Sequence, residues 1–222
     1  MAWLERLRAR VALFCLVGAV GVCHAGSYED FFDAIRLDQA EQVQVLLERG
    51  FDPNSVDGSG QAGLLVAIKG ASYKVAQVLI ADASTQVDVR NAADESPLML
   101  AALKGQADLC EQLLARDADV NKPGWTPLHY AATGAQLPVV QLLLDHYAYI
   151  DAESPNGSTP LMLAAMYGSA EIVQLLLDAG ADPGLKNALG LSAIDFALRV
   201  GKTDAAERIA KAVRDRRPKG EW

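Results

Sequence analysis

Apolar and small residues return along this chain at helical spacing, in two short motifs that alternate. The first motif reads SPLMLAALKG from Ser96, TPLHYAATGA from Thr126 and TPLMLAAMYG from Thr159. A second apolar run follows each copy, as in VVQLLLDHY and IVQLLLDAG, and turn-forming residues such as GADPG close the unit. The pattern predicts a helix, a turn, a second helix and then an extended loop.

Further copies of the first motif occur along the chain at a nearly constant period. The copies SAIDFALRVG, AGLLVAIKGA and EDFFDAIRLD begin at Ser192, Ala62 and Glu29. The gaps between the third residues of successive copies are 33, 34, 30, 33 and 33 residues. This spacing predicts six units, with approximate bounds at 28–57, 58–91, 92–121, 122–154, 155–187 and 188–213.

Physical reasons explain which residue types occur at each position of the motif. Thr126 and Thr159 can cap the first helix, and the proline that follows each of them sits where a missing N–H costs nothing. One unit alone buries too little apolar surface to offset its chain entropy, so the leucine triplets 142–144 and 175–177 must pack against neighbouring units. We interpret His129, in the fourth position of the motif, as a structural histidine that ties neighbouring loops together.

The copies from Thr126 and Thr159 resemble the ankyrin repeat almost letter for letter, in its pattern TPLHxAAxxG followed by xxxVxxLLLxxGADVN. The resemblance extends over nearly all of residues 26–213, which we predict to be the repeat domain. It implies an all-α solenoid of about six helix-turn-helix units joined by β-hairpin loops. It also implies that a partner binds mainly to the concave surface, formed by the hairpin tips and the exposed edge of the first helices.

Residues 1–25 have the pattern of a signal peptide. A charged start is followed by the apolar run VALFCLVGAVGV and then by CHA before Gly26. Twelve apolar residues are too few to cross a bilayer of about 30 Å as a helix. We therefore predict cleavage after Ala25 and no transmembrane segment in the mature chain. We expect the periplasm of a bacterium, with secretion as second choice, and lipidation at Cys23 stays open. Residues 214–222 are predicted to be a basic tail.

Charge and cysteine content narrow the function further. The formal net charge is −8, and removing Glu5 and the three arginines of the signal peptide brings it to −10. Such acidity argues against binding to nucleic acid, which needs many cationic contacts. Cys110 is the one cysteine left after cleavage, so stability must come from packing. We interpret it as a small core residue in a position that holds valine in other copies.

The chain shows none of the spacings typical of common chemical sites. HExxH, CxxC, a phosphate-binding loop and the nucleophile motif GxSxG are all absent from the sequence. We expect no catalytic residue, no metal site and no cofactor, and we interpret the protein as not an enzyme. A hydrolase with a carboxylate pair stays open as a remote alternative.

The positions just before the Thr-Pro pair and just after the Ala-Ala pair of each motif copy point to a binding face. The resemblance places them on the concave surface, where they carry seven cations against Glu95 and Glu153. The outer edges of the second helices are mainly acidic, although this contrast is also common in helices of this kind. We predict that the free protein is monomeric and that its partner is another protein with an acidic, partly apolar surface. The seven cations are Arg36, Lys69, Arg90, Lys104, Lys122, Lys186 and Arg199.

Apolar side chains lie among these cations, and the combination is typical of a protein-binding surface. Trp125 is the predicted anchor and Tyr167 the second choice, because large aromatic residues often dominate an interface. A narrower alternative is an inhibitor or immunity protein that blocks an exported enzyme or toxin. The predicted partner-binding residues are Trp125, Tyr167, Met166, Leu103, Lys69, Arg90, Lys104, Lys122, Lys186, Leu189, Leu191 and Arg199.

Overall fold

The computed structural model describes residues 26–216. The predicted signal peptide and the last residues of the predicted basic tail lie outside this range. The described chain divides into two compact units, residues 26–85 and residues 86–216, which we describe separately.

The first unit consists of helices and connecting loops. Residues 26–36 are helical and are followed by α2 (Ala40–Glu48), α3 (Gly63–Lys69) and α4 (Tyr73–Ala81). Helix α4 packs against both α2 and α3. Phe31, Ile35 and Leu64 are among the fully buried side chains of its core. The apolar positions of the motif therefore predict correctly which helix faces are buried.

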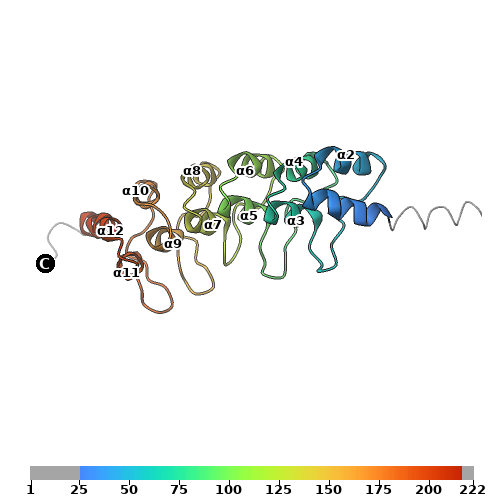
Figure 1. The fold of residues 1–222 in the computed structure, drawn as a ribbon. Helices are drawn as coiled ribbons and strands as arrows, with labels where there is room; N and C mark the ends of the chain where they lie inside the picture. The colour runs from blue at the N-terminus through green and yellow to red at the C-terminus, as the bar shows by residue number, and fades with distance from the viewer. Residues whose placement is uncertain (1–25, 217–222) are drawn as a thin grey trace, which may run out of the picture. The chain divides into compact units, whose positions relative to one another are not determined.

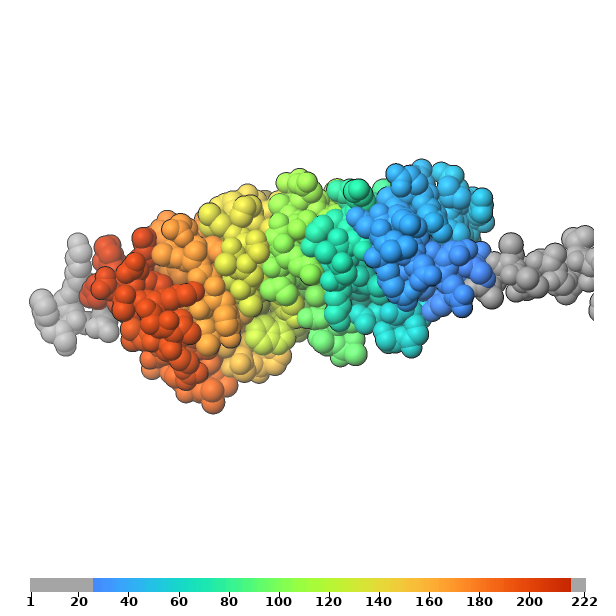
Figure 2. Space-filling model, viewed as in Figure 1, coloured from blue at the N-terminus to red at the C-terminus, as the bar shows by residue number. Residues whose placement is uncertain are grey.

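The second unit has two rows of helices, and in Figure 1 the first helices of the repeats form one row and the second helices the other. Successive first helices pack against one another, from α5 to α7, α9 and α11. In the space-filling view the repeats of this unit follow one another as successive bands (Figure 2). The first helices are α5 (Pro97–Leu103), α7 (Pro127–Thr133), α9 (Pro160–Met166) and α11 (Ala193–Arg199), and the second helices are α6 (Ala107–Leu114), α8 (Leu137–Asp145), α10 (Ala170–Asp178) and α12 (Thr203–Arg216).

Local capping fixes where the first helices begin. The Ser96 hydroxyl accepts a hydrogen bond from the Met99 N–H at 3.1 Å, and the Thr159 hydroxyl accepts one from the Met162 N–H at 3.4 Å. Proline occupies the first turn of α5, α7 and α9. These bonds satisfy backbone donors that have no partner within the helix. The sequence prediction of an all-α fold built from repeated helix pairs is confirmed.

The loops contain less β-structure than the resemblance implied. Within residues 26–216 the pairing is limited to two isolated antiparallel bridges, Val56 with Ala62 and Lys186 with Ser192. Single backbone bonds and side-chain bonds together close the loops: the Asn91 N–H donates to the Glu95 carbonyl oxygen at 3.2 Å, and the Asn91 carboxamide oxygen accepts from the N–H groups of Ala93 and Glu95, at 2.9 and 3.0 Å. A loop closed by its own side chains needs no extended ladder.

Helix α12 continues to Arg216, past the boundary at 213 expected from the sequence. The Arg216 guanidinium explains the extra turn, because it donates to the Gly180 carbonyl oxygen at 2.9 Å and lies 3.4 Å from the Asp182 carboxylate. These contacts hold the basic end of α12 against the loop that follows α10.

Candidate functional site

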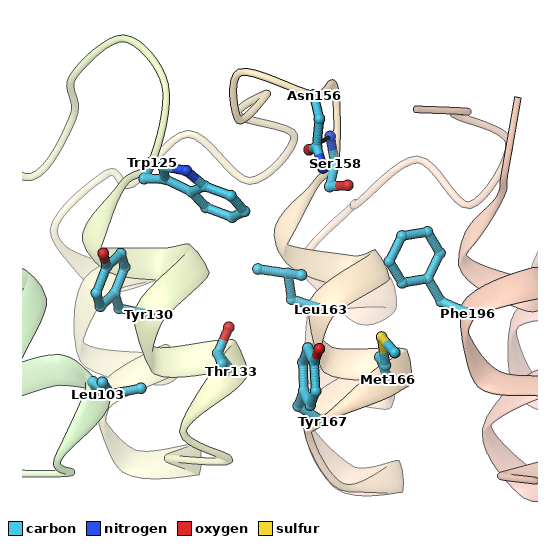
Figure 3. A pocket seen from close by; sticks show the side chains of 10 residues that line it. All are labelled: Leu103, Trp125, Tyr130, Thr133, Asn156, Ser158, Leu163, Met166, Tyr167 and Phe196. Atoms are coloured by element: carbon cyan, nitrogen blue, oxygen red, sulfur yellow. Dashed lines mark hydrogen bonds between the residues drawn. The ribbon is translucent and has the colours of Figure 1, made fainter. Parts of the chain in front are cut away.

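A groove of about 390 Å³ lies along the first helices of the second unit. Figure 3 shows side chains from successive helices lining it, with Trp125 and the 156–158 segment above them. This lining is mainly apolar and aromatic, which is typical of a binding site. The groove is lined by Leu103, Trp125, Tyr130, Thr133, Asn156, Ser158, Leu163, Met166, Tyr167 and Phe196.

The motif itself explains why these side chains meet. The fifth residue of the motif is Tyr130 in α7, Leu163 in α9 and Phe196 in α11. The eighth residue, one helical turn later, is Thr133 in α7 and Met166 in α9. Residues three apart lie on one face of a helix. Packing the first helices side by side therefore aligns these positions into one continuous groove.

Trp125 is held above the groove by one contact of its ring and one hydrogen bond to its backbone. Its indole lies edge-on to the His129 imidazole, with 5.4 Å between the ring centroids and 80° between the planes. Its carbonyl oxygen accepts a hydrogen bond from the Lys122 ammonium at 3.4 Å. The side chain is partly exposed and extends into the space between α7 and α9 (Figure 3).

His129 connects two repeats beneath this tryptophan. The Thr126 N–H donates to Nδ1 at 3.2 Å, so the ring proton is on Nε2, which donates to the Ser158 carbonyl oxygen at 2.9 Å. Burial lowers the pKa of His129 to about 4, outweighing its bond to Ser158. The imidazole is therefore neutral at pH 7. The structure places His129 in the role expected for it, and its bond to Ser158 positions a residue that lines the groove.

Tyr130 is fixed at one edge of the groove by a carboxylate. Its hydroxyl donates to Glu95 at 2.9 Å, and the Asn91 amide donates to the same carboxylate at 2.7 Å. Burial, followed by the bond to Glu95, raises the pKa of Tyr130 well above its ordinary value. Glu95, counted in the sequence as one of two opposing anions, serves here as the acceptor that orients an aromatic side chain.

Two cations of the predicted partner-binding set, Lys122 and Arg90, are in ion pairs. The Lys122 ammonium pairs with Asp94, and its side chain is only 11% exposed. Arg90 lies 3.4 Å from the Asp119 carboxylate and 3.9 Å from that of Asp88. The sequence analysis counted both among the cations of the binding face; in the structure these carboxylates offset part of their positive charge.

The remaining predicted residues are distributed unequally. Leu103, Trp125, Met166 and Tyr167 line the groove together, and Tyr167 is 52% exposed. The other members of the set are absent from the groove lining. Lys104 follows Leu103 and is partly exposed, whereas Lys186, Leu189 and Arg199 are exposed and Leu191 is partly exposed. Lys69 and Arg36, another of the seven cations predicted on the concave surface, belong to the first unit, and Arg36 pairs with Asp33 at 2.6 Å.

Six residues of the groove were not predicted from the sequence. They are Tyr130, Thr133, Asn156, Ser158, Leu163 and Phe196. The fifth position of the motif could have identified three of them, because it is large and apolar or aromatic in α7, α9 and α11 alike. Ser158 holds the position directly before the Thr-Pro pair, as Trp125 does one repeat earlier, so this position could have identified it. Asn156 lies in the loop before it, outside both helical motifs.

The groove offers few groups for chemistry. None of its ten lining residues is an acid, a cysteine or a histidine, so it gives no support to a carboxylate pair. Within residues 26–216, no cluster of three or more His, Cys, Asp or Glu side chains could hold a metal ion. Burial raises the pKa of the Cys110 thiol to about 12, which keeps it protonated and unreactive. None of the described helices combines the length and apolarity needed to span a membrane.

Known proteins match this chain over the same repeats. A family model described as ankyrin repeats in three copies matches residues 31–123, 64–154, 98–187 and 136–215. The mouse B-cell lymphoma 3 protein homolog is 34% identical over 154 residues, which are 66% of this chain and 34% of that protein. Human neurogenic locus notch homolog protein 4 is 38% identical over 86 residues, which are 39% of this chain and 4% of that protein. The chain thus spans about a third or less of the length of these relatives.

Proposed function

Because the chain belongs to the ankyrin-repeat family, we propose that it binds another protein through the groove of its second unit. The observation that carries this proposal is the row of apolar and aromatic side chains contributed by successive first helices. Met166 and Tyr167 are accessible in the free protein, although both could be buried by a partner. Burying such side chains provides most of the free energy of a protein interface.

The size and surroundings of the groove suggest what the partner presents. A volume of about 390 Å³ is enough for a few large apolar side chains. Lys104, Lys186 and Arg199 form no ion pair within the described part of the chain and supply positive charge near the first helices and their loops. A partner with apolar side chains beside carboxylates would satisfy both features.

We further propose that the protein is exported to the periplasm. The support is the charged start, the apolar run and the small residue at position 25. Fractionation of the producing cell, followed by mass spectrometry of the N-terminus, tests this proposal. We expect a periplasmic chain that begins at Gly26, and a cytosolic chain that keeps residues 1–25 would contradict it.

The groove is tested by affinity capture with matched variants. Wild type, Trp125→Ala with Tyr167→Ala, and a control with Leu137→Ala on the outer helix α8 are used in parallel on a periplasmic extract. We expect one or more proteins retained by wild type and the control and lost from the groove variant. The affinity of a purified partner should fall by at least thirtyfold in the groove variant, about 2 kcal/mol. Equal affinity for wild type and the groove variant would refute the groove as the binding site.

A further inference from the structure

The loop after α8 contains two tyrosines whose side chains are largely exposed to solvent. The Tyr147 side chain is 86% exposed and that of Tyr149 is 69% exposed. Neither residue lines the groove. Exposed aromatic side chains cost solvation free energy, so two of them within three positions at the start of this loop call for a physical explanation.

The backbone conformation at Tyr147 is also unusual for a tyrosine. Its φ is 62°, in the left-handed region that favours glycine. The equivalent position after α10 is Gly180, with a φ of 106°, and the position after α2 is Gly50, with a φ of 84°. A bulky residue is strained where glycine is not. The sequence therefore tolerates strain at Tyr147 without any burial of its side chain in return.

Tyr149 replaces a residue that stabilises the other loops. Its counterpart after α10 is Asp182, whose carboxylate accepts a hydrogen bond from the Gly184 N–H at 2.9 Å. Asp52, after α2, accepts the Asn54 N–H in the same way at 2.9 Å. A tyrosine side chain cannot make this short-range bond. Two stabilising residue types are thus replaced by exposed aromatic ones within three positions.

The loop is nevertheless held in one conformation. The Asn121 amide donates to the Tyr147 carbonyl oxygen at 2.9 Å, and its carboxamide oxygen accepts from the Tyr149 N–H at 2.7 Å. Ala148, between the two tyrosines, is buried, and its N–H donates to the Leu143 carbonyl oxygen at 2.9 Å. A fixed backbone lowers the entropy lost when the two rings bind a partner.

The charges near this loop identify the chemistry that would complement it. Exposed carboxylates occur at Asp145, directly before the loop, and at Asp117, in the loop that contains Asn121, whereas Asp119 in that loop already pairs with Arg90. Asp178 ends the next second helix and is also exposed. Aromatic faces beside carboxylates attract guanidinium and ammonium groups.

We propose that residues 146–149 form a second binding surface, which docks an arginine- or lysine-bearing segment of a partner protein. The tyrosine rings stack on the cationic side chains, and the surrounding carboxylates pair with them. This surface is separate from the groove and takes a partner of the opposite charge, so the two proposals can fail independently.

The test uses a fluorescent twelve-residue peptide of alternating arginine and glycine, with a glutamate and glycine peptide as the control probe. Binding to residues 26–222 is measured by fluorescence anisotropy at fixed salt. The key variant carries Tyr147→Gly and Tyr149→Asp, the residues found at the equivalent positions after α10. We expect its affinity for the arginine peptide to fall at least tenfold, although the variant has one more negative charge.

The design separates the tyrosines from bulk charge and from the groove. Unchanged or tighter binding by the variant would show attraction by net charge alone and would overturn the proposal. The groove variant, Trp125→Ala with Tyr167→Ala, should bind the arginine peptide within twofold of wild type, and an equal loss in both variants would also overturn it.

A fold control and a self-association control complete the experiment. Tyr147→Gly alone should be at least as resistant to urea as wild type, and a marked loss of stability would make Tyr147 a structural residue and refute the proposal. Sedimentation equilibrium of wild type should show a monomer. A dimer that is lost in the tyrosine variant would identify a second copy of this chain as the occupant and would contradict a basic partner.

Discussion

The two best copies of the repeat, from Thr126 and from Thr159, differ mainly where the candidate sites lie. They share the Thr-Pro-Leu start, the paired alanines and the leucine triplet. They also share a surface hydrogen bond of 2.8 Å between Gln141 and Asp145 in one copy, and between Gln174 and Asp178 in the other. The shared residues therefore build the helices and the core.

The differences between the two copies lie on the surface or connect repeats. Tyr147 in the first copy corresponds to Gly180 in the second, and Trp125 before the first copy corresponds to Ser158 before the second. His129 corresponds to Met162. The comparison teaches that the residues shared by the copies set the fold, while residues that differ between them contribute Trp125 to the groove, the exposed Tyr147 and, within residues 26–216, the one buried histidine.

The largest effect is expected at a shared core position. Leu128 and Leu161 are both fully buried. Replacing either by alanine should lower the free energy of unfolding by about 3 kcal/mol, because buried apolar area is lost and a cavity remains. Urea unfolding followed by circular dichroism measures this. Gln141→Ala, at a shared but exposed position, should lower the free energy of unfolding by less than about 0.5 kcal/mol. An equally small loss for Leu128→Ala would contradict the distinction between shared core positions and shared surface positions.

A second prediction concerns His129, which makes the stability depend on pH, whereas Met162 at the same position in the second copy does not titrate. Its folded pKa of about 4 lies below the unfolded value of 6.5, so the unfolded chain binds the proton first as the pH falls through that window. Acidification from pH 7 to pH 5 should then remove about 2 kcal/mol of stability through this residue.

The variant for this measurement is His129→Met, which copies the residue in the second repeat. Its stability should depend less on pH between 7 and 5 than that of wild type, and comparing the two chains cancels the titration of all other groups. Leu137→Ala, at an exposed apolar position, serves as the control and should retain the wild-type dependence. An unaltered pH profile in His129→Met would contradict the assigned cause.

A smaller effect is expected at the strained loop position. Tyr147→Gly should raise the free energy of unfolding by about 1 kcal/mol, because glycine adopts the left-handed conformation without a steric penalty. Asp117, at φ 58° in the preceding loop, is the matched position. Asp117→Gly should gain less, since aspartate tolerates this region better than tyrosine does. Equal gains at both positions would remove the argument that Tyr147 is the more strained residue.

The smallest effect tests the repeat alignment in a third copy. Cys110 is fully buried in the position that Val140 and Val173 hold in the other copies. Cys110→Val should alter the free energy of unfolding by less than about 1 kcal/mol, because the two side chains are similar in size and both apolar. A loss comparable to that of Leu128→Ala would mean that the thiol position is not equivalent to the valines.

Part of the candidate site could be predicted from the sequence alone. Leu103, Trp125, Met166 and Tyr167 were identified from the positions just before the Thr-Pro pair and just after the Ala-Ala pair, and the structure brings them to one groove. Tyr130 and Phe196 were missed because the fifth position of the motif was not considered as a surface position. The pairing of Lys122 with Asp94 was also missed, since these residues are 28 positions apart and meet only when two loops lie side by side.

The sequence by itself determined the period, the helix pairs, their caps and the buried positions, because each depends on residues within one or two helical turns. The tertiary structure decided which cations are neutralised, which side chains share the groove, and that Tyr147 adopts a left-handed backbone while its ring stays exposed. Those features depend on where one repeat places its loops against the next, and a periodic pattern carries no record of such contacts.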